Sequence, residues 1–218
     1  MLKKIFLALV ALFFIFIGGI WLLVSYMHSN PDSVFRFMDQ VIERFTAGQP
    51  YEEKSEENLH NIQHVLIRTE NSNLEIVPSD KEVLEILYTG KAPSMESGPF
   101  IEEILEGVKL EVRLHEPMSS HFFRMNINGE DVTKASNVAL IAKIFIPKKY
   151  NGVLRVETNR GNVQMQVPPG KLYEFDLRSD RGLVENTAVQ NPEKGTVNPN
   201  EVGQIQIITQ SGNITVTN

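Results

Sequence analysis

"TNRGNVQMQV" (158–167) and "TQSGNITVTN" (209–218) are nearly the same phrase. In both, a threonine is followed by two polar residues, a glycine, an asparagine and then alternating residues. The phrase belongs to a longer pattern that occurs four times without gaps: "VLIRTENSNLEI" (65–76), "LRVETNRGNVQM" (154–165), "FDLRSDRGLVEN" (175–186) and "IQIITQSGNITV" (205–216). This repetition indicates a domain built from copies of one structural unit.

Alternation within each copy predicts a strand, because successive side chains of a strand point to opposite faces. The inward residues are expected to be Val65, Ile67, Thr69, Leu154, Val156, Thr158, Phe175, Leu177, Ser179, Ile205, Ile207 and Thr209. Gly161, Gly182 and Gly212 occupy one shared position, where a tight turn favours a residue that can adopt positive φ. Ser72 is the exception at that position. We therefore predict that the three glycines are structural residues of the repeat turn.

The spacing between copies favours stacked coils. Thr69, Thr158, Ser179 and Thr209 are 89, 21 and 30 residues apart, and 21 residues is about one coil of a β-solenoid. Further strands are predicted at 84–90, 108–114 and 138–147, the last stopping at Pro147. No segment after residue 60 has helical periodicity. The predicted fold class is all-β, either β-solenoid-like or a two-layer stack of repeats.

The phrases "IRTENSNLEIVPSD", "IFIPKKYNGVLRVETNRGNV" and "IITQSGNITV" resemble the putative-adhesin family of bacterial β-strand-repeat proteins of unknown function. The resemblance covers roughly residues 60–218. It implies an extracytoplasmic β-solenoid-like domain, often found on membrane proteins, and it brings no catalytic residues with it. The chain departs from the pattern in two insertion-like stretches, 91–107 and 115–137, and in having few coils.

The N-terminal segment has the composition of a membrane helix. Residues 5–27 contain no charged side chain, and about 20 helical residues cross the hydrocarbon layer. A cleaved signal peptide is the alternative, but its apolar region is usually shorter and ends in a small-residue cleavage site. Lys3 and Lys4 precede the run, which favours a cytoplasmic N-terminus by the positive-inside rule. We expect an uncleaved single-pass anchor in the cytoplasmic membrane, with the rest of the chain outside.

Between the anchor and the repeats, residues 30–48 predict a short amphipathic helix, with apolar residues on one face and Pro31 at its first turn. This helix could pack on the domain, or it could lie on the membrane or pair with a partner helix. The following "GQPYEEKSEEN" has no apolar periodicity and is expected to be an acidic spacer. The predicted organisation is a cytoplasmic N-terminus (1–4), the anchor (5–27), the amphipathic helix and acidic linker (28–59) and the β-repeat domain (60–218).

Composition excludes several function classes. A net charge of −6 argues against broad nucleic-acid binding, which needs clustered basic residues, and the absence of cysteine excludes disulfides and thiolate metal sites. His60 and His64 have the spacing of a zinc helix, but Asn61 stands where the catalytic glutamate would be, so a solvated strand entry is favoured. Paired glutamates occur as surface runs. We predict a protein that is not an enzyme and needs no cofactor or metal.

One stretch, 115–137, is the least strand-like part of the domain. It is expected to be a loop that covers one end of the core or, alternatively, to expose an apolar patch to a partner. The candidate contact residues are Phe122, Phe123, Met125 and Ile127.

The leading hypothesis for function is an adhesin-like module that binds a protein partner or a cell-envelope component while its helix contacts membrane lipid. The alternative is a structural or sensory envelope component that acts through self-association or association with other membrane proteins. The closing copy raises a related question, because little sequence follows Val216. Either residues 115–137 or the helix at 34–45 cover this strand, or it is a docking edge for self-assembly or a partner strand.

Overall fold

The computed structural model describes residues 2–29, 40, 48–94, 96–117, 123–127, 130–134, 138–189 and 202–218. The chain divides into two compact units, Met1–Arg44 and Phe45–Asn218. The first unit contains the helix α1 (Leu2–Ser29). Within the described residues, no helix qualifies as long and apolar enough to cross a membrane. Apart from Gln40, the amphipathic helix predicted at 30–48 falls on residues 30–47, which lie outside this description.

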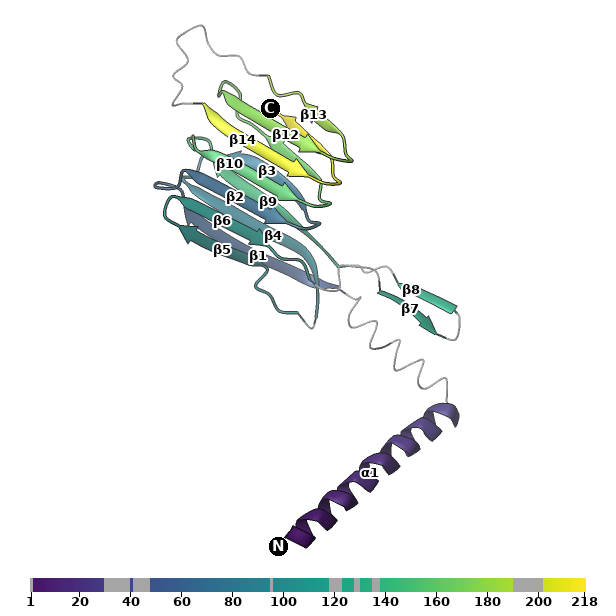
Figure 1. Ribbon diagram of the computed structural model, residues 1–218. Helices are drawn as coiled ribbons and strands as arrows, with labels where there is room; N and C mark the ends of the chain where they lie inside the picture. The colour runs from purple at the N-terminus through teal and green to yellow at the C-terminus, as the bar shows by residue number, and fades with distance from the viewer. Residues whose placement is uncertain are drawn as a thin grey trace. The chain divides into compact units, whose positions relative to one another are not determined.

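The second unit consists of two layers of β-sheet (Figure 1). Its strands are β1 (Gly48–Asn58), β2 (His64–Thr69), β3 (Asn73–Ser79), β4 (Val83–Pro93), β5 (Ile101–Glu106), β6 (Lys109–Leu114), β7 (Phe123–Ile127), β8 (Glu130–Lys134), β9 (Ala139–Pro147), β10 (Val153–Thr158), β11 (Val163–Gln166), β12 (Tyr173–Ser179), β13 (Val184–Asn186), β14 (Gly203–Thr209) and β15 (Ile214–Thr217). The described strands form a seven-stranded sheet in the order β1-β4-β9-β3-β11-β15-β13, a six-stranded sheet in the order β12-β14-β10-β2-β6-β5, and the hairpin β7-β8.

Each copy of the repeat forms a strand, a turn and a second strand. The first strands (β2, β10, β12, β14) lie in the six-stranded sheet and the second strands (β3, β11, β13, β15) in the seven-stranded sheet. Neighbouring copies pair in parallel and in register, so Thr158 lies beside both Thr69 and Thr209. The predicted all-β, two-layer, solenoid-like stack of repeats is confirmed, as are the strands predicted at 84–90, 108–114 and 138–147.

The core lies between the two sheets. Inward residues of internal copies are almost completely buried, including Ile67, Val156 and Ile207. Strands β4 and β9 add Ile86, Tyr88 and other buried side chains to the same cluster. Alternation along each strand therefore decides which side chains enter the core, as the sequence predicts.

Hydroxyl side chains fix the repeat turn. The backbone amide of Gly161 donates to Thr158 Oγ1 over 3.0 Å, and that of Gly182 donates to Ser179 Oγ over 2.8 Å. The equivalent bond in the first copy, from Ser72 N to Thr69 Oγ1, measures 3.4 Å. In these three copies the local bond satisfies a turn amide, which is a reason for Thr or Ser at this place in the phrase. The fourth copy differs, because Thr209 Oγ1 is buried without a hydrogen-bond partner among the described residues.

The repeat glycines are structural, but the predicted reason, positive φ, is wrong. Positive φ occurs at four other described glycines, whereas Gly161, Gly182 and Gly212 lie outside the left-handed region. They are needed because successive turns touch. A Cβ at Gly161 would lie 1.9 Å from the carbonyl oxygen of Ser72. A Cβ at Gly212 would lie 2.1 Å from that of Gly161, and one at Gly182 would lie 1.9 Å from that of Gly212.

An asparagine ladder runs beside the glycine contacts. Asn73 Oδ1 accepts from the backbone amide of Asn162 over 3.0 Å, and Asn162 Oδ1 accepts from that of Asn213 over 2.9 Å. Asn213 Oδ1 in turn accepts from the amide of Leu183 over 2.9 Å. Each asparagine thus connects its turn to the next layer, and the ladder stops at Leu183, which has no amide side chain to continue it.

Ser72 differs from the repeat glycines because, among the described residues, no further repeat turn lies beyond it. Its Oγ lies 2.6 Å from the Tyr88 hydroxyl and donates to Glu116 Oε1 over 3.0 Å. Glu116 also accepts from the backbone amide of Asn71 over 2.5 Å. A carboxylate and a tyrosine hydroxyl therefore occupy the place that another turn takes in the rest of the stack.

The acidic spacer prediction is wrong, and the compact unit begins before residue 60. Residues 48–58 form β1, which pairs antiparallel with β4 along its whole length. Its inward side chains are Tyr51, which packs against the core, and three polar residues, Glu53, Ser55 and Glu57. Glu53 accepts from the Phe100 amide over 2.7 Å, and Ser55 hydrogen-bonds Glu103 of β5. Because three of its four inward side chains are polar, the strand lacks the apolar alternation by which strands are recognised.

The closing copy of the repeat lies inside the stack. Strand β15 pairs with β11 on one side and with β13 on the other, and β14 lies between β10 and β12. The docking-edge hypothesis for residues 213–218 is therefore wrong. The two segments expected to cover it, residues 115–137 and the helix predicted at 34–45, lie partly and almost wholly, respectively, outside the described residues. The third copy, β12 and β13, pairs outside the fourth and becomes the end of the stack (Figure 1).

Candidate functional site

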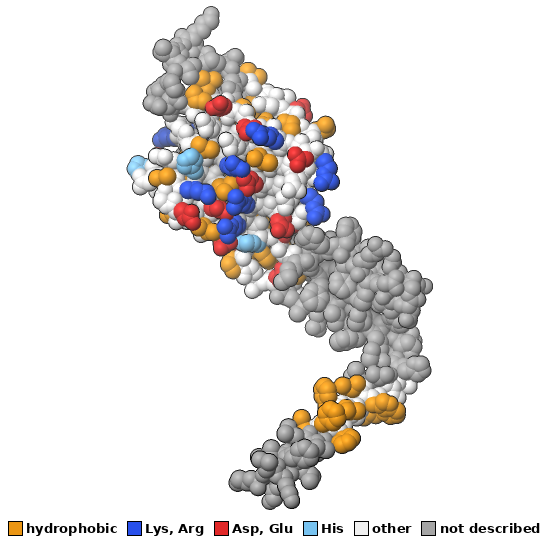
Figure 2. Space-filling view, in the orientation of Figure 1, with side chains coloured by type: hydrophobic (Ala, Val, Ile, Leu, Met, Phe, Trp, Pro, Cys, Tyr) orange, Lys and Arg blue, Asp and Glu red, His pale blue; other side chains and the backbone are white. Residues whose placement is uncertain are grey.

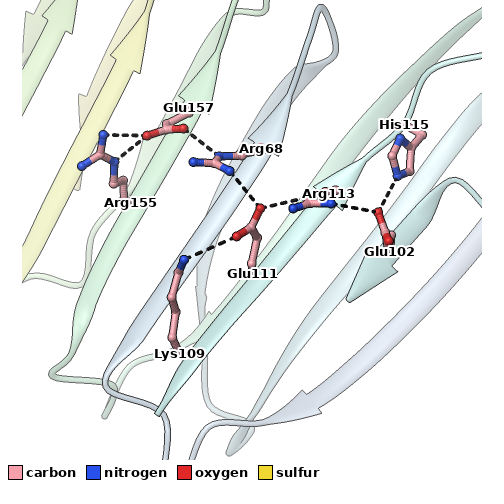
Figure 3. Close-up of polar contacts among 8 residues, drawn as sticks. All are labelled: Arg68, Glu102, Lys109, Glu111, Arg113, His115, Arg155 and Glu157. Carbon is pink, nitrogen blue, oxygen red and sulfur yellow. Dashed lines mark hydrogen bonds and ion pairs between the residues drawn. The ribbon is translucent and has the colours of Figure 1, made fainter. Parts of the chain in front are cut away.

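A row of ionised side chains crosses the outer face of the six-stranded sheet (Figure 3). Strands β10, β2 and β6 are parallel and in register, so Glu157, Arg68 and Arg113 are direct neighbours. Two residues earlier along the strands, Arg155, Leu66 and Glu111 are neighbours in the same way. Alternation places all these residues on the face away from the core.

Glu111 holds the centre of this row. Its Oε1 accepts from Arg68 Nη1 over 2.9 Å and from Arg113 Nε over 2.8 Å, and its Oε2 lies 3.4 Å from Lys109 Nζ. Arg68 and Arg113 would otherwise meet as like charges on adjacent strands, which is destabilising. Glu111 is buried, and the three cations compensate its lost hydration. The hydrogen bond from Arg113 is the main reason that the pKa of Glu111 is lowered.

Glu157 and Glu102 extend the row on either side. Glu157 accepts from Arg68 Nε over 2.8 Å and from Arg155 Nε over 2.6 Å. Burial by itself would raise the pKa of Glu157, but the bonds from the two arginines outweigh it and the pKa is lowered. Glu102 of β5 lies 3.6 Å from Arg113 Nη1 and 3.0 Å from His115 Nε2. We call the eight residues of Figure 3 the charged face: Arg68, Glu102, Lys109, Glu111, Arg113, His115, Arg155 and Glu157.

The charged face has an excess of positive charge. Of its eight side chains, four are cationic at neutral pH, three are carboxylates and one is a histidine. The sum with neutral histidine is +1, in a chain whose net charge is −6. Figure 2 shows basic, acidic and histidine side chains gathered over the same part of the repeat domain. Such a surface favours contact with groups of negative charge.

A shallow hollow of about 430 Å³ opens at one edge of the charged face. Its lining includes Arg68, Arg113, Arg155 and His115, together with the strand-end residues Thr158 and Asn159. The three arginines are about half exposed, with exposed side-chain fractions of 42–46%. Their guanidinium groups have donors suited to carboxylate or phosphate oxygens. Two carboxylates also line the hollow: Glu157, which accepts from Arg68 and Arg155, and the exposed Glu70. The three arginines outnumber them, so the arrangement is fitted for binding an anionic group.

None of the residues predicted to contact a partner belongs to the charged face. Phe122 lies outside the described residues, as do the side chains of Phe123, Met125 and Ile127. Their backbone is not a plain loop, because Phe123–Ile127 pairs antiparallel with Glu130–Lys134 to form the hairpin β7-β8. Their contact with a partner stays a prediction.

The histidine motif is placed as expected for a strand entry. His64 is the first residue of β2, and both His60 and His64 are exposed. Among the residues that the structure describes, no group of three or more His, Asp or Glu side chains is arranged to hold a metal ion.

Sequence reasoning missed the charged face although it contained the signals. Because Leu154, Val156 and Thr158 are predicted to point inward, alternation places Arg155 and Glu157 between them on the outward face, and "KLEVRL" (109–114) alternates in the same way. Alternation does not show which strands lie side by side. Arg68 contacts Glu111 and Glu157, which are 43 and 89 positions away in the sequence.

The family model for Toastrack DUF4097 matches residues 62–218. The chain belongs to this family. The match begins just before β2 and covers all four copies of the repeat. The family resemblance predicted from the repeat phrases is thereby confirmed for the Toastrack domain.

Three solved structures are similar to the chain, and their names describe adhesion proteins. A putative cell adhesion protein from Clostridium sporogenes shares 12% identity over 78% of this chain and 99% of its own, with a TM-score of 0.41. A putative adhesin from Parabacteroides merdae shares 14% identity over 78% of this chain and 56% of its own, with a TM-score of 0.34. One from Parabacteroides distasonis shares 9% identity over 78% of this chain and 71% of its own, with a TM-score of 0.28. No curated protein matches the sequence.

Proposed function

We propose that the protein is a membrane-tethered, non-enzymatic binding module of the cell envelope. Its Toastrack domain holds an anionic protein or envelope component against the charged face. The observation that supports this proposal best is the cluster of three half-exposed arginines around the hollow, in a chain that is otherwise acidic. Because Glu111 and Glu157 fix the arginines in place, little side-chain entropy is lost when a ligand binds.

The anchor is proposed from the sequence. Residues 5–27 are uncharged, and the described large apolar side chains of α1 are exposed on all sides, among them Ile15 at 74% and Trp21 at 70%. A helix that is apolar all round needs an apolar environment. Lys3 and Lys4 orient it with the Toastrack domain outside the cytoplasmic membrane. Reporter fusions after Asn218 test this topology, and a reporter that is active only in the cytoplasm would contradict it.

Binding is tested by crosslinking in intact cells, with captured partners identified for the wild type and for Arg68→Glu/Arg155→Glu. The double variant replaces two donors of the hollow and should lose the captured partner. Lys149→Glu is the matched control, because Lys149 is an exposed lysine outside the charged face. If the double variant captures the same partners in the same yield, binding at the charged face is refuted.

The alternative, a structural or sensory component that acts by self-assembly, is favoured by a different feature. The third copy of the repeat leaves its inward residues only half-buried at the end of the stack.

A further inference from the structure

The core is incomplete at the end of the stack that β12 and β13 form. Inward residues of the internal copies, such as Ile67 and Ile207, are fully buried, whereas the equivalent Leu177 and its neighbour Phe175 are half-buried. Leu183, at the turn between the two strands, is 77% exposed. Among the described strands, the last layer therefore has packing on one side only, whereas each internal layer has it on both.

The strand pairing of the described residues also ends here. Among the described strands, β12 pairs with β14 alone and β13 pairs with β15 alone. Leu183 stands at the ladder position that asparagine fills in the other copies. A free strand edge with apolar residues beside it is the surface to which another strand adds.

The opposite end of the stack is protected from such pairing by its charge. Strand β5 carries Glu102, Glu103 and Glu106 and no basic residue, and β1 carries four glutamates and one lysine. Two copies that met at this end would bring glutamates together. Negative charge on an edge strand is a common means of preventing association.

The edge of β12 is complementary to itself. Its outward residues are Glu174, Asp176 and Arg178, and Arg178 Nε donates to Asp176 Oδ1 over 2.7 Å. When two β12 strands pair antiparallel with Leu177 at the centre, each residue faces the residue of the other copy that lies equally far from Leu177 on its other side. Asp176 of each copy then faces Arg178 of the other, and the two Leu177 side chains meet on the core side. Opposite charges directly across an antiparallel pair are stabilising.

We propose that the chain forms a two-fold dimer in which β12 pairs antiparallel with β12 of a second copy, centred on Leu177. The two-fold axis is perpendicular to the sheets, so the β13 edges meet in the other layer and the cores of the two copies become continuous. The interface uses the same surface of both copies and leaves the acidic ends outermost, so assembly closes at two chains. This inference goes beyond the proposed anion binding and does not depend on it, because no residue of β12 or β13 lines the hollow.

The register is tested with single cysteines in the full 218-residue chain, which contains no native cysteine. Leu177→Cys should form a disulfide-linked dimer under mild oxidation, because the residue faces its own copy across the axis. Glu174→Cys on the same strand is the matched control. In this register the two Glu174 positions are six residues apart along the strand, roughly 20 Å, and a disulfide needs Cα atoms within about 7 Å. No dimer from Leu177→Cys, or an equal dimer from Glu174→Cys, would overturn the proposal.

The charges are tested by sedimentation of the full chain in detergent. Asp176→Arg should weaken association at least about tenfold, and so should Arg178→Asp, because each places like charges opposite one another. The double variant Asp176→Arg/Arg178→Asp restores the pairing and should return the dissociation constant to within about threefold of the wild type. Glu82→Lys, at an exposed ion pair away from β12, should leave association unchanged.

The results distinguish this dimer from the other possible occupants of the edge. If residues 190–201 of the same chain cover β12, all the variants remain monomers like the wild type, and the proposal is refuted. If a different protein binds there, the purified chain is monomeric, which refutes it as well. If Arg68→Glu/Arg155→Glu loses partner capture and still dimerises, both proposals are supported. If the wild type dimerises but captures no partner, the dimer is supported and binding at the charged face is refuted.

Discussion

Replacing Gly161 by alanine tests the contact between successive turns. The new Cβ would lie 1.9 Å from the Ser72 carbonyl oxygen, 2.8 Å from its carbonyl carbon and 3.0 Å from Thr158 Oγ1. Because two of these atoms belong to the backbone, the layers must separate. Such overpacking costs about 1–3 kcal/mol. Separation also weakens the 3.0 Å bond between the Asn162 amide and Asn73, at about 0.5–1.5 kcal/mol.

The expected loss of stability for Gly161→Ala is therefore about 1.5–4.5 kcal/mol. This corresponds to a fall in Tm of about 3–18 °C in a domain of this size. Thermal and urea unfolding of the full chain in detergent, followed by circular dichroism, measures this loss. Tryptophan fluorescence is unsuitable, because the single tryptophan, Trp21, lies in the other compact unit.

Two matched variants separate turn contact from backbone strain. Gly107 has φ of +61° and no atom within 4 Å of the place that a Cβ would take, so Gly107→Ala should cost only the left-handed strain, about 1–2 kcal/mol. Gly182→Ala makes an equally close contact with Gly212, but it lies in the end layer, which can move outward. It should cost less than Gly161→Ala. A Tm of Gly161→Ala within about 1 °C of the wild type, or a larger loss at Gly107, would refute the reasoning.

Three further outcomes are expected. Deleting residues 213–218 removes β15 from between β11 and β13, so the domain should fail to fold; a folded truncation would show that the observed strand order is wrong. Glu111 has a pKa below its ordinary 4.5, chiefly through Arg113, so its stabilisation is complete above pH 4.5 and is lost as the pH falls through the lowered pKa. Melting from pH 7 to 3 should show this decline, and Glu111→Gln should melt lower at pH 7 with a smaller decline. Burial first, and Glu103 second, raise the pKa of Glu57, so the fold favours its protonated form below pH 4.5 and loses this contribution as the pH rises through the raised pKa. Glu57→Gln should therefore melt higher than the wild type at pH 7 and equally at pH 3, and an equal Tm at pH 7 would contradict the assignment.

Local pattern predicted much of the repeat. Alternation assigned Ile67, Val156 and Ile207 to the core, because the side-chain period of a strand is a property of its own backbone. The turn was predicted at the right residues as well. Its hydrogen bonds to hydroxyl groups, such as that from Gly161 N to Thr158 Oγ1, join residues three positions apart, so they depend only on the sequence of a single copy.

The sequence by itself determined the class of fold, the number of repeat copies and the faces of their strands. Only the tertiary structure decided the order of the copies, because all four present similar strand edges and alternation does not select a neighbour. That order explains the glycines through contact with the next turn, buries the closing copy, and exposes β12 as the end of the stack. It also brings Arg68 to Glu111 and Glu157, 43 and 89 residues away. The sequence does not reveal β1 either, because polar inward side chains such as Ser55 find their partners only in the folded domain, where Glu103 of β5 lies opposite.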